Sequence, residues 1–230
     1  MTQLLISVTS VEEARIAAES GADIIDLKDP HSGALGALPL PSIQSIMAYM
    51  RSEQVGKPVS ATIGDVPMEL NLTEPNIVER ATALAASGVD FIKIGFFEAK
   101  DYQPCLGALL PVIESGVQLI AVLFAEYQYP DSLVDDIHQA GFAGLMLDTA
   151  HKCGQTILYY HSCNNYAVLA EKVKNKGMAF GLAGSLRVED IDQLKHLAPT
   201  YMGFRGGVCE QNSRIAALDK EKIKAIRKVL

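Results

Sequence analysis

The amino-acid sequence predicts an α/β protein, a single-domain (β/α)8 TIM barrel that spans residues 1–230. Three observations lead to this prediction. Eight short apolar runs alternate with longer amphipathic stretches. Most of these runs are apolar throughout rather than at alternate positions, which is typical of parallel strands covered on both faces. The length of 230 residues is also close to the roughly 250 residues usual for this fold.

The apolar runs are the predicted strands. In chain order they are LLISV (4–8), ADIIDLK (22–28), VSATIG (59–64), FIKIGF (91–96), QLIAVLF (118–124), GLMLDT (144–149), AFGLAGS (179–185) and YMGFRGG (201–207). The phrases ESGADIIDLK, ASGVDFIKIG and QAGFAGLMLD repeat the same features: a helix end, a glycine, and a strand that finishes on a charged residue. Such a recurrence suggests stacked βα units.

Residues that favour helix ends lie between the runs. The first helix is predicted to begin with Thr9 or Ser10 as its N-cap. Glu12 and Glu13 would then lie in the first turn, where negative charge is favourable. The second helix is predicted to follow Pro41, because proline is common at the start of a helix.

The third helix is predicted to start near Thr73, with Glu74 and Pro75 at its beginning, and to end at Gly88. Glycine is a common helix terminator because it adopts the left-handed conformation easily. The later helices have similar signals, with starts at Asp101, Asp131, Asn165 and Glu189 and ends at Gly116, Gly141 and Gly177.

The main alternative architecture is a doubly wound open sheet. That fold would normally be shorter, and no G-x-G-x-x-G motif follows the first strand. No Pro/Ser/Gly-rich linker divides the chain, so we predict one domain. The Gly- and Pro-rich segment HSGALGALPLP (31–41) is expected to form a functional loop after the second strand.

Charge and composition exclude several classes of function. The chain has 27 Asp and Glu against 20 Lys and Arg, a net charge of -7. We therefore expect no nucleic-acid and no membrane partner, although a locally positive pocket for a small anion remains compatible with this charge. The four cysteines form no C-x-x-C pair, and neither a signal peptide nor an apolar stretch of about 20 residues is recognisable. These features predict a cytoplasmic protein with reduced thiols.

Charged residues at the ends of the predicted strands are candidates for catalysis, because barrels bind substrate at the C-terminal side of the strands. These residues are Asp26, Lys28, Lys93, Asp148 and, just beyond its strand, Lys152. A lysine within an apolar strand is costly to bury unless it is paired. Lys28 and Lys93 could belong to structural ion pairs, but two lysines at equivalent strand ends, with carboxylates nearby, favour catalysis. Lys152 could equally be a third active-site cation or an exposed lysine.

A pair of buried lysines has a specific chemical use. Desolvation and a second ammonium nearby both lower the pKa of a lysine from its free value near 10.4. The neutral amine can add to an aldehyde or ketone and form an iminium, which makes protons on the adjacent carbon acidic. Carboxylates such as Asp26 and Asp148 could orient the second lysine or transfer protons. This is the chemistry of a Schiff-base aldolase.

Two glycine-rich segments, GLAGSLR (181–187) and GFRGGVC (203–209), follow the seventh and eighth predicted strands. Barrels commonly bind phosphate at these two positions. Glycines allow backbone N–H groups to approach an anion closely. The candidate phosphate ligands are Gly184, Ser185, Gly206 and Gly207, with Arg205 as a cationic partner. The alternative is that these segments are tight turns that need glycine for geometry alone.

The remaining polar residues are interpreted as structural or exposed. The spacings His151-x-Cys153 and His161-x-Cys163 match no common zinc pattern, so no metal is predicted. His31 is expected to be a solvated loop residue. A solvated amphipathic C-terminal helix is predicted from Glu210, Arg214, Asp219, Lys220 and the tail KEKIKAIRK.

Together, these motifs resemble a known family. The stretch LLISVTSVEEARIAAESGADIIDLKDPHSGALGA looks like the N-terminus of the (5-formylfuran-3-yl)methyl phosphate synthases of methanofuran biosynthesis. Further matching segments are VSATIGD (59–65), DFIKIGF (90–96), LMLDTAHK (145–152), GLAGSL (181–186) and GFRGGVC (203–209). The resemblance covers nearly the whole chain, and the combination of DLKDP with LDTAHK is specific.

The resemblance implies a (β/α)8 enzyme without a cofactor. It would condense two molecules of glyceraldehyde 3-phosphate into a phosphorylated furan aldehyde, with loss of phosphate and water. The resemblance also implies that Lys28 forms the Schiff base and that Lys93 transfers protons. Asp26, Asp148 and Lys152 match the family's remaining polar active-site positions. No family role is carried over to the stretch TILYYHSCNN (156–165).

Two alternatives remain open at this point. The chain could be another class I (Schiff-base) aldolase that acts on a phosphosugar, or a non-catalytic phosphosugar-binding protein. The second alternative would need no nucleophile in an apolar strand, so the lysine pair favours the enzyme. Because barrels of this size often associate through their outer helices, we also expect a homo-oligomer.

Overall fold

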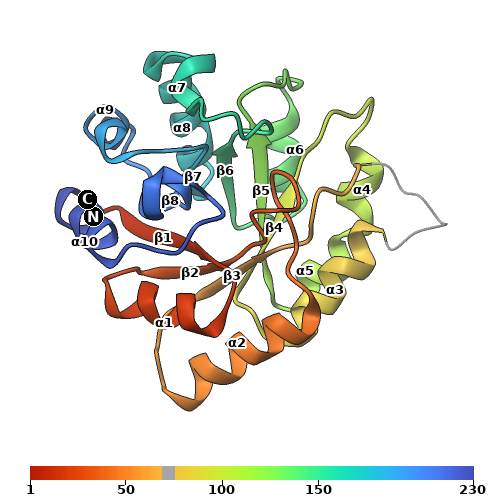
Figure 1. Ribbon diagram of the computed structural model, residues 1–230. Helices are drawn as coiled ribbons and strands as arrows, with labels where there is room; N and C mark the ends of the chain where they lie inside the picture. Colours follow the sequence, from red (N-terminus) through yellow and green to blue (C-terminus); the bar gives the residue numbers. More distant parts are fainter. Residues whose placement is uncertain (69–75) are drawn as a thin grey trace.

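The computed structural model describes residues 1–68 and 76–230, and eight parallel strands form one closed barrel in chain order, β1 to β8 (Figure 1). The strands are β1 (Gln3–Val8), β2 (Ile24–Leu27), β3 (Val59–Thr62), β4 (Phe91–Gly95), β5 (Gln118–Phe124), β6 (Gly144–Asp148), β7 (Ala179–Leu182) and β8 (Tyr201–Phe204). Parallel pairing of β1 with β8 closes the ring. The predicted TIM barrel is confirmed, and the open-sheet alternative is excluded.

Helices surround the strands (Figure 1). The α-helices are α1 (Val11–Glu19), α2 (Leu40–Ser52), α3 (Ile77–Ser87), α4 (Gln103–Ala108), α5 (Leu110–Glu114), α6 (Leu133–Gln139), α7 (Ile157–Tyr160), α8 (Cys163–Asn175), α9 (Ile191–Leu194) and α10 (Lys220–Val229). Four short 3₁₀ turns are η1 (Val188–Asp190), η2 (Lys195–Leu197), η3 (Gly206–Val208) and η4 (Glu210–Asn212). In the described residues, no helix is long and apolar enough to cross a membrane.

The apolar residues form two separate layers, which explains why the strands are apolar at nearly every position. Side chains that point outward from the strands pack with the helices in a large cluster that includes Ile6, Ile25 and Leu119. Side chains that point inward, such as Leu5 and Ile24, form a smaller cluster within the barrel. Successive residues of a strand face opposite sides, so each strand contributes to both layers.

Helix ends agree with the prediction where capping chemistry is strong. The Ser10 hydroxyl accepts a hydrogen bond from the Glu13 amide at the start of α1. Gly88 ends α3 in the left-handed conformation, with φ of 80°. The start predicted near Thr73–Pro75 lies outside the described residues, and α3 begins after Asn76, whose side chain forms a capping box with Glu79.

Some predicted boundaries are wrong in the C-terminal half of the barrel, where the strand predicted over 201–207 ends at Phe204 and Gly206–Val208 form η3. The helix predicted to start at Asn165 begins at Cys163, because Ser162 is the N-cap and accepts a hydrogen bond from the Asn165 amide. The strand predicted over 179–185 ends at Leu182. Gly184 and Ser185 have φ values of 92° and 55°, which a strand does not allow. The chain therefore turns sharply at this point, above the barrel.

The C-terminal helix is also shorter than predicted. It begins only at Lys220, where the Asp219 carboxylate accepts hydrogen bonds from the Glu221 and Lys222 amides. Glu210 belongs to η4, and Arg214 lies in the loop before the helix. This correction places Arg214 next to the cavity described below.

Candidate active site

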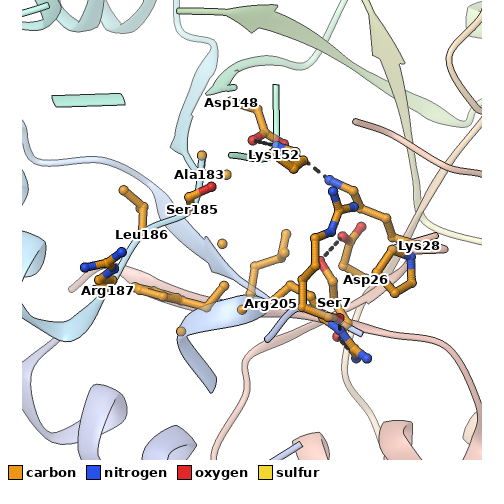
Figure 2. A pocket seen from close by; sticks show the side chains of 18 of the residues that line it. Ser7, Asp26, Lys28, Asp148, Lys152, Ala183, Ser185, Leu186, Arg187 and Arg205 are labelled. Carbon is orange, nitrogen blue, oxygen red and sulfur yellow. Dashed lines mark hydrogen bonds and ion pairs between the residues drawn. The ribbon is translucent and has the colours of Figure 1, made fainter. Parts of the chain in front are cut away.

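A cavity of about 300 Å³ opens at the C-terminal ends of the strands, and we call it the main cavity. It is lined by all the residues selected from the sequence, and Figure 2 shows among them Asp26, Lys28, Asp148, Lys152, Ser185 and Arg205. The lining includes Ser7, Asp26, Lys28, Lys93, Asp148, Lys152, Gly184, Ser185, Arg187, Arg205, Gly206, Gly207 and Arg214. Side chains from β1, β2, β4 and β6 form its floor, and the loops after β7 and β8 form one wall.

Lys93 and Asp26 form a buried ion pair on the floor of the main cavity. The Lys93 Nζ lies 2.6 Å from the Asp26 Oδ1, and both side chains are buried. The hydroxyls of Ser7 and Ser60 donate to the same carboxylate at 2.7 and 2.6 Å. Strand register explains this arrangement, because Asp26 pairs with Ser7 on β1 and with Ser60 on β3. Three inward-facing polar side chains therefore meet at one level.

The electrostatics of this pair favour an ionised carboxylate. Burial alone would raise the pKa of Asp26, but the charges of Lys93 and Lys28 outweigh burial, so the pKa of Asp26 is lowered. Burial lowers the pKa of Lys93 from its usual 10.5, and the charge of Lys28 lowers it further, against the opposing charge of Asp26. Lys93 is therefore held where it can exchange a proton more easily than a free lysine.

A second group of charges surrounds Asp148 at the end of β6. The Lys28 Nζ donates to Asp148 Oδ2 at 3.3 Å, and the Lys152 Nζ donates to Asp148 Oδ1 at 2.5 Å (Figure 2). The Thr149 amide donates to the same Oδ1, and its hydroxyl accepts from Lys152. Lys152 thus lines the main cavity and is half-buried rather than exposed.

The pKa values around Asp148 have clear causes. Burial would raise the pKa of Asp148, but the charges of Lys152 and Lys28 hold it well below its usual range. Burial and the charge of Lys28 lower the pKa of Lys152 to about 8, although Asp148 opposes this effect. Because three lysines share two carboxylates, full protonation would leave an excess positive charge. The group can therefore attract an anion and release a proton near neutral pH.

The loops after β7 and β8 touch each other closely. A Cβ on Gly207 would collide with the carbonyl oxygen of Leu186, and a Cβ on Gly184 would lie 2.6 Å from the side chain of Ile157. Both glycines are therefore required by packing. They also leave backbone exposed to the main cavity, where Ser185 adds a hydroxyl. The turn interpretation and the phosphate-binding interpretation are thus compatible in this structure.

Arg205 differs from the expectation that it would bind phosphate. Its five N–H groups all donate to protein acceptors: both carboxylate oxygens of Glu13 and the carbonyl oxygens of Ser7, Arg214 and Ala216. The Glu13 side chain is only 14% exposed, so this pair is shielded from water. No donor of Arg205 is left for a ligand in this arrangement. Its guanidinium instead holds the β8 loop against β1 and α1.

Arg214 was missed by the sequence prediction, which placed it in a solvated helix. It is half-buried, lines the main cavity, and donates one hydrogen bond to the Gly33 carbonyl oxygen at 3.0 Å. Burial lowers the pKa of its guanidinium even though Asp148 is near. The sequence contains a signal that could have placed Arg214 in a loop. Asp219 is a good N-cap, so the last helix is expected to begin after it, and Arg214 lies between the GFRGG segment and Asp219. It therefore had to belong to the loop over the last strand.

In residues 1–68 and 76–230, no group of three or more His, Cys, Asp or Glu side chains could hold an ion. Cys153 is exposed, and its Sγ donates to the Gln155 Oε1 at 3.3 Å.

The sequence is similar to one family model and to several named proteins. A family model described as 4-HFC-P synthase matches residues 4–227. A protein of Methylorubrum extorquens, provisionally named (5-formylfuran-3-yl)methyl phosphate synthase, is 38% identical over 96% of this chain and 88% of its own length. The (5-formylfuran-3-yl)methyl phosphate synthases of Methanococcus maripaludis strain C7 and Methanocaldococcus jannaschii are 36% and 32% identical, each over 98% of both chains.

Solved structures share the fold at low sequence identity. Phosphoribosyl anthranilate isomerase from Thermus thermophilus has a TM-score of 0.66 at 17% identity, over 99% of this chain and 98% of that one. A 3-hexulose-6-phosphate synthase has a TM-score of 0.64 at 15% identity, over 100% of both chains. At these identities the likeness concerns the barrel alone.

Proposed function

The chain belongs to the 4-HFC-P synthase family of enzymes, the (5-formylfuran-3-yl)methyl phosphate synthases, and from this premise we propose that it condenses two glyceraldehyde 3-phosphate molecules through a Schiff base on Lys28. The observation that supports this most directly is that the buried Lys28 and Lys93 and the half-buried Lys152 gather around only two carboxylates. Burial lowers the pKa of Lys93 and of Lys152 in this arrangement, and the neutral form of a lysine amine is the one that adds to a carbonyl.

Lys28 is the better nucleophile of the two strand-end lysines. Lys93 is held at 2.6 Å by a carboxylate with 0% exposure, whereas the contact of Lys28 to Asp148 is longer, at 3.3 Å. Lys28 is also slightly more exposed, at 8% against 3% for Lys93. Its amine can therefore reach a carbonyl in the main cavity, while Lys93 stays on the floor as a proton acceptor and donor.

The proposed reaction balances without an added oxidant or reductant. The Lys28 amine adds to one aldehyde and water leaves, which gives an iminium. The adjacent carbon loses a proton, for which Lys93 is the proposed acceptor, and the resulting enamine attacks the second aldehyde. Ring closure, eliminations and release of Lys28 yield the furan aldehyde phosphate. The net change is the loss of one phosphate and two water molecules from two triose phosphates, and the iminium itself is the electron sink.

Two phosphate groups need two anion sites. We assign the first to the backbone of the loops after β7 and β8, around Gly184, Ser185, Gly206 and Gly207, because glycine loops above strands seven and eight are the usual phosphate position in barrels. We assign the second to Arg214, a half-buried cavity arginine whose side chain has one hydrogen bond within the described part of the chain. Arg205 supports the first site indirectly, since its donors are already used.

An Arg214→Gln variant is expected to raise the KM for glyceraldehyde 3-phosphate about ten- to a hundredfold and to change kcat less. A charge-assisted hydrogen bond is worth about 1.5–3 kcal/mol, and glutamine cannot replace the charge. Steady-state kinetics would measure both constants. Arg51→Gln is the matched control, because Arg51 lies on the outside of the barrel and donates to Ser87. An unchanged KM in Arg214→Gln would contradict the second phosphate site.

Lys152 gives an expected pH dependence. We propose that its ammonium form is the active one, as a proton donor and anion partner, so activity should fall as the pH rises through about 8, the pKa of Lys152 in the folded protein. Arginine stays protonated at this pH. The alkaline limb of the kcat/KM profile should therefore move to higher pH in Lys152→Arg. A limb that stays near pH 8 in this variant would assign the ionisation to another group.

The lowered pKa of Lys152 also makes the stability of the fold depend on pH. The folded protein loses the Lys152 proton near pH 8, whereas the unfolded chain keeps it until about 10.5. The unfolded state therefore binds more protons in this window. The contribution of Lys152 to the free energy of unfolding should rise as the pH increases from 8 to 10.5.

The proposed function is tested by incubating the protein with glyceraldehyde 3-phosphate and identifying the product by mass spectrometry. A phosphorylated furan aldehyde and one equivalent of inorganic phosphate are expected. Addition of borohydride during turnover should reduce the iminium to a stable adduct on Lys28. A different sugar phosphate product would indicate another class I aldolase, and the absence of both product and adduct would indicate a binding protein.

A further inference from the structure

Glu126 lies in the tight turn that follows β5, and its side chain is directed to the neighbouring strand end. The Tyr127 amide donates to the Phe124 carbonyl oxygen at 3.1 Å, which closes the turn. The Ala125 amide donates to the Asp148 carbonyl oxygen at 2.9 Å, so the parallel pairing of β5 with β6 continues up to the turn. The Glu126 side chain is therefore held beside the segment where the chain leaves β6.

The Glu126 carboxylate binds two successive amides of that segment. Its Oε2 accepts from the Ala150 amide and its Oε1 accepts from the His151 amide, each at 2.9 Å. Hydrogen bonds to an ionised acceptor are about twice as strong as those between neutral groups. Glu126 is half-buried, so water competes with these bonds only in part. The two bonds therefore fix the backbone directly before Lys152.

This part of the backbone has no regular structure of its own. β6 ends at Asp148, and the next helix, α7, begins only at Ile157. Lys152 nevertheless folds back, and its Nζ donates to the Asp148 Oδ1 at 2.5 Å and to the Thr149 hydroxyl at 3.2 Å (Figure 2). A contact between residues four apart is usual in a helix, but residues 149–152 are not helical. Another group must hold the chain in this turn.

We propose that Glu126 is a positioning residue, which holds the loop after β6 so that Lys152 reaches Asp148 in the main cavity. Glu126 does not line this cavity in the described part of the chain, so it acts through Lys152 rather than on the substrate. The inference deepens the proposed function, and its catalytic consequence rests on the role proposed there for Lys152.

The titration of Lys152 reports its position without any substrate. Burial and the charges of Lys28 and Arg214 lower the pKa of Lys152 to about 8 in the held position, against the opposing charge of Asp148. If the loop is released, Lys152 moves into water and its pKa should return towards the ordinary 10.5. Loss of the Glu126 charge alone would act in the opposite direction, because a nearby negative charge raises the pKa of a lysine. A rise therefore reports movement.

A Glu126→Gln variant tests the inference. Glutamine keeps the size of the side chain, but its NH2 group cannot accept from one of the two amides. Competitive acetylation with acetic anhydride at a series of pH values, followed by peptide mass spectrometry, gives the titration midpoint of Lys152. This midpoint should rise from about 8 towards 10.5. Glu114→Gln, at the exposed end of α5, is the matched control and should not change it. An unchanged midpoint in Glu126→Gln would overturn the inference.

Kinetics then show whether the effect passes through Lys152. The kcat/KM of Glu126→Gln should fall at least about tenfold, since a misplacement of about 1 Å can cost a hundredfold. In a Lys152→Met background the same change should have no further effect, because no ammonium remains to be positioned. An equal loss in both backgrounds would overturn the inference, since it would indicate a general effect on the fold.

The outcomes separate this inference from the proposed function. A wild type that forms neither the furan product nor the Lys28 adduct would reject the proposed function, whereas a raised Lys152 midpoint in Glu126→Gln would still support the positioning. A raised midpoint together with wild-type kinetics in Glu126→Gln would also support the positioning, and would reject the role proposed for Lys152 in catalysis.

Discussion

The Lys28→Ala variant is expected to lose turnover by at least about a thousandfold and to form no borohydride-stable adduct with substrate. The alanine side chain has no amine to form the iminium, and removal of a covalent nucleophile typically costs most of the catalysed rate. The fold should remain, because Asp148 keeps Lys152 as its partner at 2.5 Å. The measurements are the initial rate of furan aldehyde formation and mass spectrometry of the trapped protein.

Two further variants distinguish nucleophilic catalysis from simple charge. Lys28→Arg keeps the positive charge next to Asp148 but cannot form a Schiff base under these conditions. It should be as inactive as Lys28→Ala. Lys100→Ala removes an exposed lysine after β4 and should behave as the wild type. Substantial turnover in Lys28→Arg, or an adduct at a different lysine, would contradict the assignment of Lys28.

The Asp26→Asn variant is expected to lose about 3–5 kcal/mol of unfolding free energy as well as activity. The change leaves the Lys93 charge buried in the barrel without its counter-ion, and a broken buried pair is destabilising by this amount. The Lys93 and Asp26 side chains are 3% and 0% exposed, so water cannot replace the lost partner. Urea denaturation monitored by circular dichroism would give the free energy.

A double variant isolates the cause of this loss. In Asp26→Asn/Lys93→Met the unpaired charge is gone, so most of the lost stability should return, while activity should not. If the double variant stays as unstable as Asp26→Asn, the loss must come from the Ser7 and Ser60 hydrogen bonds instead. In the wild type, the stabilisation from Asp26 is present above its ordinary pKa of 3.8 and is lost as the pH falls through the lowered native pKa.

The sequence was sufficient to predict the barrel and its charged strand ends. Parallel strands with two covered faces are apolar at consecutive positions, so Lys93 and Asp148 are conspicuous within their runs. Their shared location follows from the fold, because all strand ends point to one side. The same reasoning could not decide whether Lys152 is an active-site cation or an exposed lysine, because its position depends on how the chain turns after β6.

Residues whose function depends on strand register or loop conformation could not be found in this way. Ser7 and Ser60 contact Asp26 because the register aligns them on β1, β2 and β3. Serines in strands are too common for sequence alone to select them. The predictions for Arg205 and Arg214 were both wrong. Arg205, expected to bind phosphate, donates to Glu13, and Arg214, expected in a solvated helix, lines the main cavity. Only the loop path distinguishes the two.

The pairing of β8 with β1 has a consequence for the synthesis of this protein on the ribosome. Arg205 donates to Ser7 and Glu13, residues almost two hundred positions earlier, and the two chain ends lie close together (Figure 1). Such distant contacts form late in folding, since a long loop must close first. We therefore expect the main cavity, which the β8 loop helps to line, to be incomplete while the last strand is still inside the ribosome. We expect a nascent chain to be inactive until β8 pairs with β1 and closes the barrel.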